Sequence, residues 1–228
     1  MEKIIAPIEC IRGGLIVSCQ AREDSPLCGS TFMAAMARCA EIGGAAGIRA
    51  NGPSNIKAIK EAVSLLVIGI YKIICAGSEP YITPTFEAAK EVAKAGVDII
   101  AVDATLRPHA NGLSAHELIA QIKTLGLPVM ADISTCEEGV AAEEAGADIV
   151  ATTLSGYTPY SRQLEGPDFE LISELVKAVR ILVIAEGRIW TPEQARKALG
   201  LGAHAVVVGT AITRPEIITK RFSEALTE

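Results

Sequence analysis

The sequence predicts an α/β fold, namely a single-domain (β/α)8 TIM barrel that covers residues 1–228. Three observations support this prediction. The length of 228 residues suits one barrel of this class, which usually takes about 250 residues. Half of the residues are apolar and only 4% are aromatic, a composition suited to close packing of helices on a sheet. A helical stretch, a glycine and a short apolar strand also follow one another repeatedly along the chain.

The repeated pattern appears at residues 42–49, 95–103, 145–153 and 201–209. Glycine after a helix commonly caps it in the left-handed conformation, and a short apolar run without polar alternation is typical of a strand buried on both faces. The clearest run, residues 181–185, ends at Glu186, and a helix start follows at Thr191-Pro192-Glu193. Buried strands that alternate with helices indicate a parallel sheet.

Eight strands and the helices between them can be placed in order. The strands are predicted near residues 15–20, 46–50, 67–72, 99–103, 129–132, 149–153, 182–186 and 206–209. The helices are predicted near 30–41, 55–64, 86–95, 114–125, 136–145, 169–179 and 192–199, with a last helix after Arg214-Pro215. A short helix at residues 1–7 is expected to cover the barrel bottom. A doubly wound sheet is the alternative, but no G-x-G-x-x-G follows any strand.

The composition argues against several classes of function. A net charge of −6 and an isoelectric point near 5.2 disfavour nucleic acid as the main partner. No apolar run approaches the roughly 18 residues that a membrane span needs, and Pro7 comes too early for a signal peptide. The six cysteines are scattered without a Cys-x-x-Cys pair, which predicts reduced thiols, packed as small buried groups, in a cytoplasmic protein.

Polar residues stand at the predicted ends of seven strands, each after an apolar run. They are Gln20, Arg49, Lys72, Asp103, Asp132, the pair Thr152 and Thr153, and Glu186. A charge at the end of a buried strand costs free energy unless it is paired or used. The carboxyl ends of barrel strands meet at one mouth, so these side chains are expected to form a site there. The alternative is that some are loop charges facing solvent, Asp103 above all.

The loops after the last two strands predict a phosphate site. Gly187-Arg188 follows the seventh strand, and residues 209–215 follow the eighth. Barrels often bind phosphate with backbone N–H groups of these two loops, and Arg188 or Arg214 would add a charge-assisted contact. The alternative is that Gly209 is only a turn and Arg214 only a surface cation.

A lysine and a glutamate are expected to share this mouth without a metal. The three histidines, His109, His116 and His204, are dispersed, so no metal site is predicted. Lys72 would act as a Schiff-base nucleophile or as a general base with a lowered pKa. Arg49 would lower that pKa and Glu186 would raise it, and the sequence leaves the balance open.

The chain resembles the N-acetylmannosamine-6-phosphate 2-epimerase family over nearly its whole length. The residues that carry the resemblance include Gly156-Tyr157-Thr158 after the sixth strand and 211–215, Ala-Ile-Thr-Arg-Pro, after the eighth. The other matching segments are 13–20, 68–72, 81–85, 103–105, 130–132, 152–155, 183–187 and 208–210. The resemblance implies a phosphate-binding barrel that interconverts N-acetylmannosamine 6-phosphate and N-acetylglucosamine 6-phosphate in sialic acid catabolism.

The resemblance also implies roles for particular residues. Lys72 would accept and return the proton at C2, with Glu186 as its catalytic partner. The residues expected to bind the sugar are Gln20, Arg49, Asp132, Thr153 and Tyr157. Those expected to surround the phosphate are Gly187, Arg188, Gly209, Thr210 and Arg214. No cofactor and no metal are implied, and a homo-oligomer, favoured as a dimer, is expected.

One segment departs from the family pattern. The family usually continues after the catalytic lysine with Arg-Asp, whereas Ile73-Ile74-Cys75 follows Lys72 here. This removes an arginine and an acid from the rim beside the base, and the apolar pair would be a subunit contact or a packed loop. Three hypotheses therefore stand: the epimerase, a Schiff-base aldolase on a phosphorylated sugar, and a phosphosugar-binding sensor that has lost activity.

Overall fold

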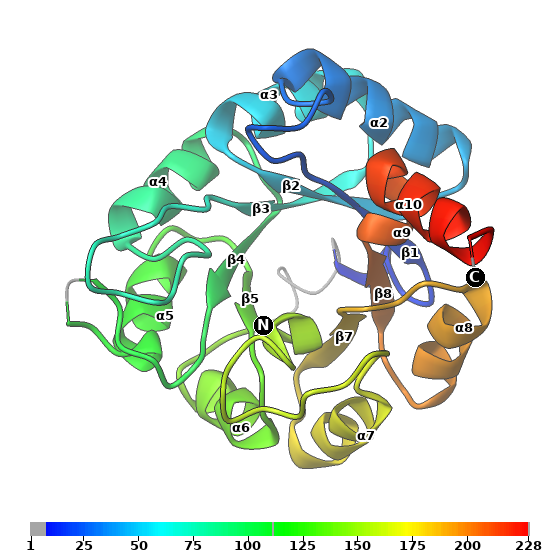
Figure 1. Ribbon diagram of the computed structural model, residues 1–228. Helices are drawn as coiled ribbons and strands as arrows, with labels where there is room; N and C mark the ends of the chain where they lie inside the picture. Colours follow the sequence, from blue (N-terminus) through cyan, green and yellow to red (C-terminus); the bar gives the residue numbers. More distant parts are fainter. Residues whose placement is uncertain (1–7, 111, 228) are drawn as a thin grey trace.

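The computed structural model describes residues 8–110 and 112–227, which form a closed barrel of eight parallel strands in chain order, β1 to β8. The predicted (β/α)8 fold is confirmed: the strands ring the centre of Figure 1 and the helices lie around them. The strands are β1 (Leu15–Cys19), β2 (Gly47–Asn51), β3 (Leu66–Ile70), β4 (Ile99–Asp103), β5 (Val129–Asp132), β6 (Ile149–Ala151), β7 (Leu182–Glu186) and β8 (Ala205–Val208).

Helices connect the strands on the outside of the barrel. They are α2 (Ser30–Ile42), α3 (Pro53–Ala62), α4 (Phe86–Lys94), α5 (Ala115–Lys123), α6 (Cys136–Glu144), α7 (Phe169–Ala178) and α8 (Pro192–Gly200). A 3-10 turn η1 (Thr152–Leu154) follows β6, and two further helices, α9 (Thr210–Thr213) and α10 (Pro215–Ala225), follow β8. Thr135 and Thr191 cap α6 and α8 with complete capping boxes, which explains why these helices begin where the sequence predicts.

Two strands end two residues earlier than predicted. β3 ends at Ile70, so Lys72 lies beyond it, where it pairs with Ile82 in an isolated antiparallel bridge. β6 ends at Ala151, and Thr152 and Thr153 belong to the 3-10 turn. Both strands end early for the same reason. After each of them the chain leaves the barrel wall to form other contacts, which a run of apolar residues in the sequence does not indicate.

Side chains of the strands alternate between the barrel interior and the helix layer. On β1, Ile16 belongs to the interior cluster, whereas Val17 packs in the outer cluster between strands and helices. The same alternation places Ile68, Ile99 and Ile184 inside the barrel. A residue two or four positions beyond an interior residue therefore faces the mouth at the carboxyl ends, which explains why the polar strand ends converge.

Ile8 and Ile11 fill the opposite end of the barrel, where they join the interior cluster. Nε2 of His204 lies 3.2 Å from the carbonyl oxygen of Ile8, and the N–H of Gly13 donates to the carbonyl of His204 at 2.7 Å. His204 precedes β8, so it lies at the amino end of the barrel. The helix predicted at residues 1–7 lies outside the described residues.

The cysteines differ from the prediction. Cys19 is buried, whereas Cys10, Cys28 and Cys39 are exposed, so the expectation of small buried groups is right for Cys19 and wrong for these three. These three thiols lie outside the barrel wall, on the first turns and helix of the chain. In the part of the chain that the structure describes, every helix is too short or too polar to cross a membrane.

Candidate active site

An open cavity of about 1220 Å³ occupies the carboxyl ends of the strands. All the site residues that the family resemblance implies, except Asp132, line it; of the other polar strand ends, Asp103 and Thr152 do not. Those that line it are Gln20, Arg49, Lys72, Thr153, Tyr157, Glu186, Gly187, Arg188, Gly209, Thr210 and Arg214. They come from β2, β7 and the segments after β1, β3, β6, β7 and β8, so the barrel topology brings together residues that are far apart in sequence.

A buried ion cluster forms one wall of the cavity. Arg49 is 1% exposed and donates to both carboxylate oxygens of Asp132, at 3.0 and 2.5 Å. The same guanidinium also pairs with the carboxylate of Glu186. The hydroxyl of Thr153 donates to Asp132 at 2.6 Å and lies 3.2 Å from Glu186. Side chains from β2, β5 and β7 and from the turn after β6 are thus locked into one geometry.

Opposing influences set the charges of this cluster. Burial lowers the pKa of Arg49, but the carboxylates of Asp132 and Glu186 outweigh it and raise the pKa, so the guanidinium stays charged. Burial is the largest cause that raises the pKa of Glu186. The Arg49 guanidinium lowers this pKa, and the negative charge of Asp132 raises it. On balance the pKa of Glu186 is raised above its ordinary value.

Lys72 enters the same cavity from the segment after β3. Its side chain is exposed at the open mouth, and its ammonium lies 5.8 Å from the centre of the Tyr81 ring. The cavity walls shield the amine from water, and this loss of hydration is the larger cause that lowers the pKa of Lys72. The positive charge of Arg49 lowers the pKa further. Glu186 and Asp132 oppose this shift without cancelling it, so the balance that the sequence left open falls on the side of a lowered pKa for Lys72.

Asp132 and Asp103 do not line the cavity. Asp132 is 0% exposed behind Arg49, so the structure gives it a supporting position and no direct access to a sugar. Asp103 is also fully buried, where it accepts hydrogen bonds from Thr105 and from Arg107. The alternative that Asp103 is a solvent-facing loop charge is therefore wrong, and its contacts anchor the loop after β4.

The loops after β7 and β8 form the far side of the cavity. Gly209 precedes the short helix α9, and the hydroxyl of Thr213 donates to the carbonyl of Ser18 at 2.9 Å. Arg214 ends this turn, and its Nε donates to Glu216 at 2.8 Å. The cation at the cavity edge is thus held by an acid on α10, and Arg214 still lines the cavity.

Arg188 occupies a niche built by the loop after β6. Its Nε donates to the carbonyl of Gly166 at 2.9 Å, and its guanidinium lies 5.6 Å from the centre of the Tyr157 ring. A Cβ on Gly156 would stand 2.1 Å from an Arg188 nitrogen. The glycine and the tyrosine of the Gly-Tyr-Thr motif therefore have a physical role, since one gives the guanidinium room and the other gives it a ring to lie on.

Gly156→Ala is expected to destabilise the fold more than Gly126→Ala does, by about 1–3 kcal/mol, because of the added crowding. Both glycines have φ +77, but a Cβ on Gly126 has nothing within 4 Å. The backbone strain is thus matched, and the difference reports the displaced guanidinium. Urea unfolding of both variants measures this difference in unfolding free energy. Equal losses of stability would show that Arg188 moves aside freely. In an Arg188→Ala background the difference between the two glycine variants should become smaller.

Other cavity residues were not predicted from the sequence. Tyr81 and Asn51 lie next to Lys72, and Ser18 and Trp190 line the opposite side. Burial raises the pKa of Tyr81, as do the charges of Asp132 and Asp103, so its phenol stays protonated. Asn51 has a signal in the sequence, because it stands two positions beyond Arg49 and so shares its inward face.

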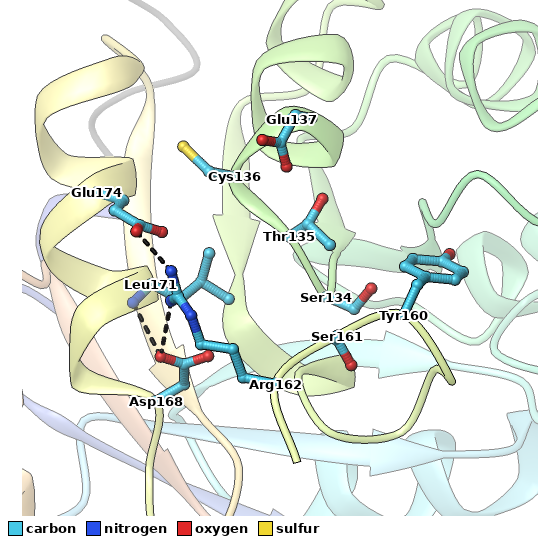
Figure 2. Close-up of a pocket in the computed structure, with 10 residues that line it drawn as sticks. All are labelled: Ser134, Thr135, Cys136, Glu137, Tyr160, Ser161, Arg162, Asp168, Leu171 and Glu174. Carbon is cyan, nitrogen blue, oxygen red and sulfur yellow. Dashed lines mark hydrogen bonds and ion pairs between the residues drawn. The ribbon is translucent and has the colours of Figure 1, made fainter. Parts of the chain in front are cut away.

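A second cavity of about 400 Å³ lies outside the barrel mouth, between the start of α6 and α7 (Figure 2). None of the predicted site residues lines it. Arg162, its one cation, points at Asp168 and Glu174 and pairs with both, at 3.3 and 2.6 Å. That charge is already neutralised, so the larger mouth cavity is the candidate active site.

No group of three or more histidine, cysteine, aspartate or glutamate side chains is placed to hold a metal ion within residues 8–110 and 112–227. The mouth instead offers one amine, one buried arginine–dicarboxylate cluster and a set of backbone and arginine donors. This arrangement suits proton transfer on an anionic ligand that is held at its far end.

Comparison with known proteins identifies the family. Residues 33–228 match the model of the N-acetylmannosamine-6-phosphate epimerase family. A relative from Caldanaerobacter subterraneus, named N-acetylmannosamine-6-phosphate 2-epimerase, is 57% identical over 94% of this chain and 92% of its own. A relative of the same name from Clostridium perfringens is 53% identical, over 96% of this chain and 99% of its own.

Solved structures agree with these relatives. The Clostridium perfringens N-acetylmannosamine-6-phosphate 2-epimerase structure superposes with a TM-score of 0.93 at 53% identity and covers 96% of this chain and 95% of that one. A thiamine phosphate pyrophosphorylase from Pyrococcus furiosus, at 19% identity and a TM-score of 0.59, shares the fold alone. The chain belongs to the N-acetylmannosamine-6-phosphate epimerase family.

Proposed function

We propose that this protein is an isomerase that interconverts N-acetylmannosamine 6-phosphate and N-acetylglucosamine 6-phosphate. The two sugars differ only in configuration at C2, so the reaction moves one proton and needs no redox cofactor. Family membership supports the substrate. The observation that carries the mechanism is Lys72, an amine with a lowered pKa that shares one cavity with the Arg49–Glu186 pair and the loops after β7 and β8.

The C2 proton becomes acidic once the sugar ring is open and C1 is an aldehyde. Neutral Lys72 takes this proton, the C2–H electrons form the C1–C2 double bond, and the charge moves to the C1 oxygen. The intermediate then rotates in the cavity, Lys72 returns the proton to the opposite face of C2, and the aldehyde reforms with inverted configuration. Positive charge near the oxygen stabilises the enolate by several kcal/mol, on the order of an oxyanion-hole donor.

Glu186 is the proposed partner for ring opening, since burial raises its pKa and lets it exchange a proton with the ring oxygen or the C1 hydroxyl. Two buried polar atoms of the cavity wall, Oε1 of Gln20 and Nε of Arg49, have no hydrogen-bond partner among the described residues. Buried polar groups without partners are costly, so a polar ligand would satisfy them. Asp132 is proposed to hold the Arg49 guanidinium in place without touching the sugar. Thr153 and Tyr157 also line the cavity and would contact the sugar.

The phosphate is proposed to lie at the far side, where backbone groups approach it closely. The groups that would hold it are Gly187, Arg188, Gly209, Thr210 and Arg214, which all line the cavity. Charge-assisted contacts of this kind fix one end of the sugar and present C2 to the amine. The exposed Ile74, at 94%, lies on the rim beside Lys72 and adds no charge there.

The wider setting is also a proposal. A reaction on this substrate belongs to amino-sugar and sialic acid catabolism in the cytoplasm. A homo-oligomer, with a dimer favoured, is supported by α10, which has no buried residue; Phe222 on it and Leu226 just after it are strongly exposed. Apolar side chains exposed on a terminal helix are typical of a surface that a second copy covers.

Solvent exchange at C2 tests the proposed function. Incubation with N-acetylmannosamine 6-phosphate in heavy water should give deuterium at C2 and the second epimer, both observed by NMR. Binding without exchange would support the sensor hypothesis and refute the epimerase. Borohydride added with substrate should leave Lys72 unmodified, whereas a trapped covalent adduct on Lys72 would support the aldolase.

A further inference from the structure

We propose that Thr83 and Asn51 are positioning residues that hold the backbone of Lys72 and so aim its amine at the substrate. The inference rests on the proposed role of Lys72 as the base. It follows from the segment after β3, which carries the lysine but has left the barrel wall. Such a segment needs other contacts to keep a catalytic amine in place.

Three consecutive backbone N–H groups around the lysine are satisfied by groups outside β3. The N–H of Tyr71 donates to the Thr83 hydroxyl at 3.1 Å. The N–H of Lys72 donates to Oδ1 of Asn51 at 2.8 Å, and the N–H of Ile73 donates to the carbonyl of Tyr81 at 3.0 Å. Two of these three acceptors are side chains, so particular residues, and not only the backbone fold, determine where the lysine lies.

The Thr83 hydroxyl links two strands. It accepts from Tyr71 and donates to the carbonyl of Ala101 on β4 at 2.6 Å. The Thr83 N–H in turn donates to the carbonyl of Tyr71 at 2.9 Å, which doubles the connection. The start of the lysine segment is therefore tied to the interior strand β4 through one buried hydroxyl.

The backbone of Thr83 supports a specific role for its side chain. Its φ is +48, a left-handed conformation that β-branched residues rarely adopt and that glycine or asparagine adopts readily. Thr83 is also 0% exposed. A buried threonine in a glycine-like conformation is best explained by its hydroxyl, which glycine lacks and which makes both bonds described above.

Asn51 holds the lysine from the other neighbouring strand. It is the last residue of β2, two positions beyond Arg49, and its own carbonyl accepts from the Asn55 side chain at 2.9 Å. This bond from α3 fixes the backbone of Asn51, whose side-chain oxygen accepts from the N–H of Lys72. Thr83, which is bonded to β4, and Asn51, which ends β2, hold the lysine segment from the two sides of β3, and together they fix the backbone that carries the amine.

Matched variants of Thr83 test this inference. Thr83→Val keeps the shape and the β-branching but loses the hydroxyl, and it should lower kcat for C2 exchange about 10- to 100-fold with KM within about threefold. Thr83→Ser keeps the hydroxyl and should restore kcat to within about threefold of wild type. Thr124→Val is the control, because that exposed hydroxyl only donates to the carbonyl of Gln121 at 2.6 Å and should leave kcat unchanged.

The results separate this inference from the proposed function. Absence of exchange in the wild-type protein would refute the function itself. Wild-type exchange with an unchanged kcat in Thr83→Val, or a loss that Thr83→Ser does not rescue, would overturn the positioning role alone. If Thr83→Val does not fold, Asn51→Leu decides in its place, with the same expected fall in kcat; an unchanged kcat there overturns the inference. In a double variant that folds, the two losses should be less than additive, because both residues hold one segment.

Discussion

Lys72→Met is expected to lower the rate of C2 proton exchange by about 10³- to 10⁴-fold, the upper range of a positioned general base. Methionine matches the length of lysine but carries no amine that can accept the proton. The side chain is exposed at the mouth, so the free energy of unfolding should change by less than about 0.5 kcal/mol. NMR in heavy water measures the exchange, and urea unfolding measures the stability.

Lys90→Met is the matched control for this prediction. Lys90 also lies over an aromatic ring, with its ammonium 5.0 Å from the centre of Phe86, but it stands on α4 away from the cavity. Its loss should leave exchange unchanged. Calorimetry should still detect binding of the phosphosugar to Lys72→Met, because the loops after β7 and β8 are intact. Exchange at the wild-type rate in Lys72→Met would assign the proton transfer to another group.

The sequence was sufficient to predict the barrel, because its interior and its helix layer require only apolar residues at the spacing typical of strands and helices. The run before Glu186 predicts β7 with both of its ends correct, and the cap at Thr191 predicts the helix after it. Most polar strand ends also reached the mouth as predicted. Period-two alternation explains this, since Arg49, Lys72 and Glu186 each continue the inward face of a strand.

The support of the site was not predictable in the same way. Tyr81 and Thr83 reach the lysine segment through the bridge between Lys72 and Ile82, in a stretch flanked by Pro80 and Pro84. Prolines argue against a strand, so nothing local indicates this pairing. For Asp132 the inward position was predicted, but its complete burial behind Arg49 was not. That burial depends on its ion pair with Arg49, which the sequence alone does not show.

Arg49→Met is expected to cost about 3–5 kcal/mol of unfolding free energy at pH 8, because it removes a buried cation and leaves two buried carboxylates without a partner. Arg49 is 1% exposed, and Asp132 and Glu186 are 0% and 13% exposed at the side chain. Arg12→Met is the control, since its ion pair with Glu9 at 2.7 Å is well exposed and its loss should cost about 0–1 kcal/mol.

The pH dependence of the Arg49→Met loss identifies its cause. Burial already raises the pKa of Glu186, and removal of the arginine takes away the charge that opposes this rise. A carboxyl whose pKa is higher in the folded than in the unfolded protein favours folding at low pH and loses that contribution as pH rises through the folded pKa. The loss should therefore be smaller at pH 5 than at pH 8. A loss that is equal at both pH values would indicate a packing defect, because a cavity does not titrate.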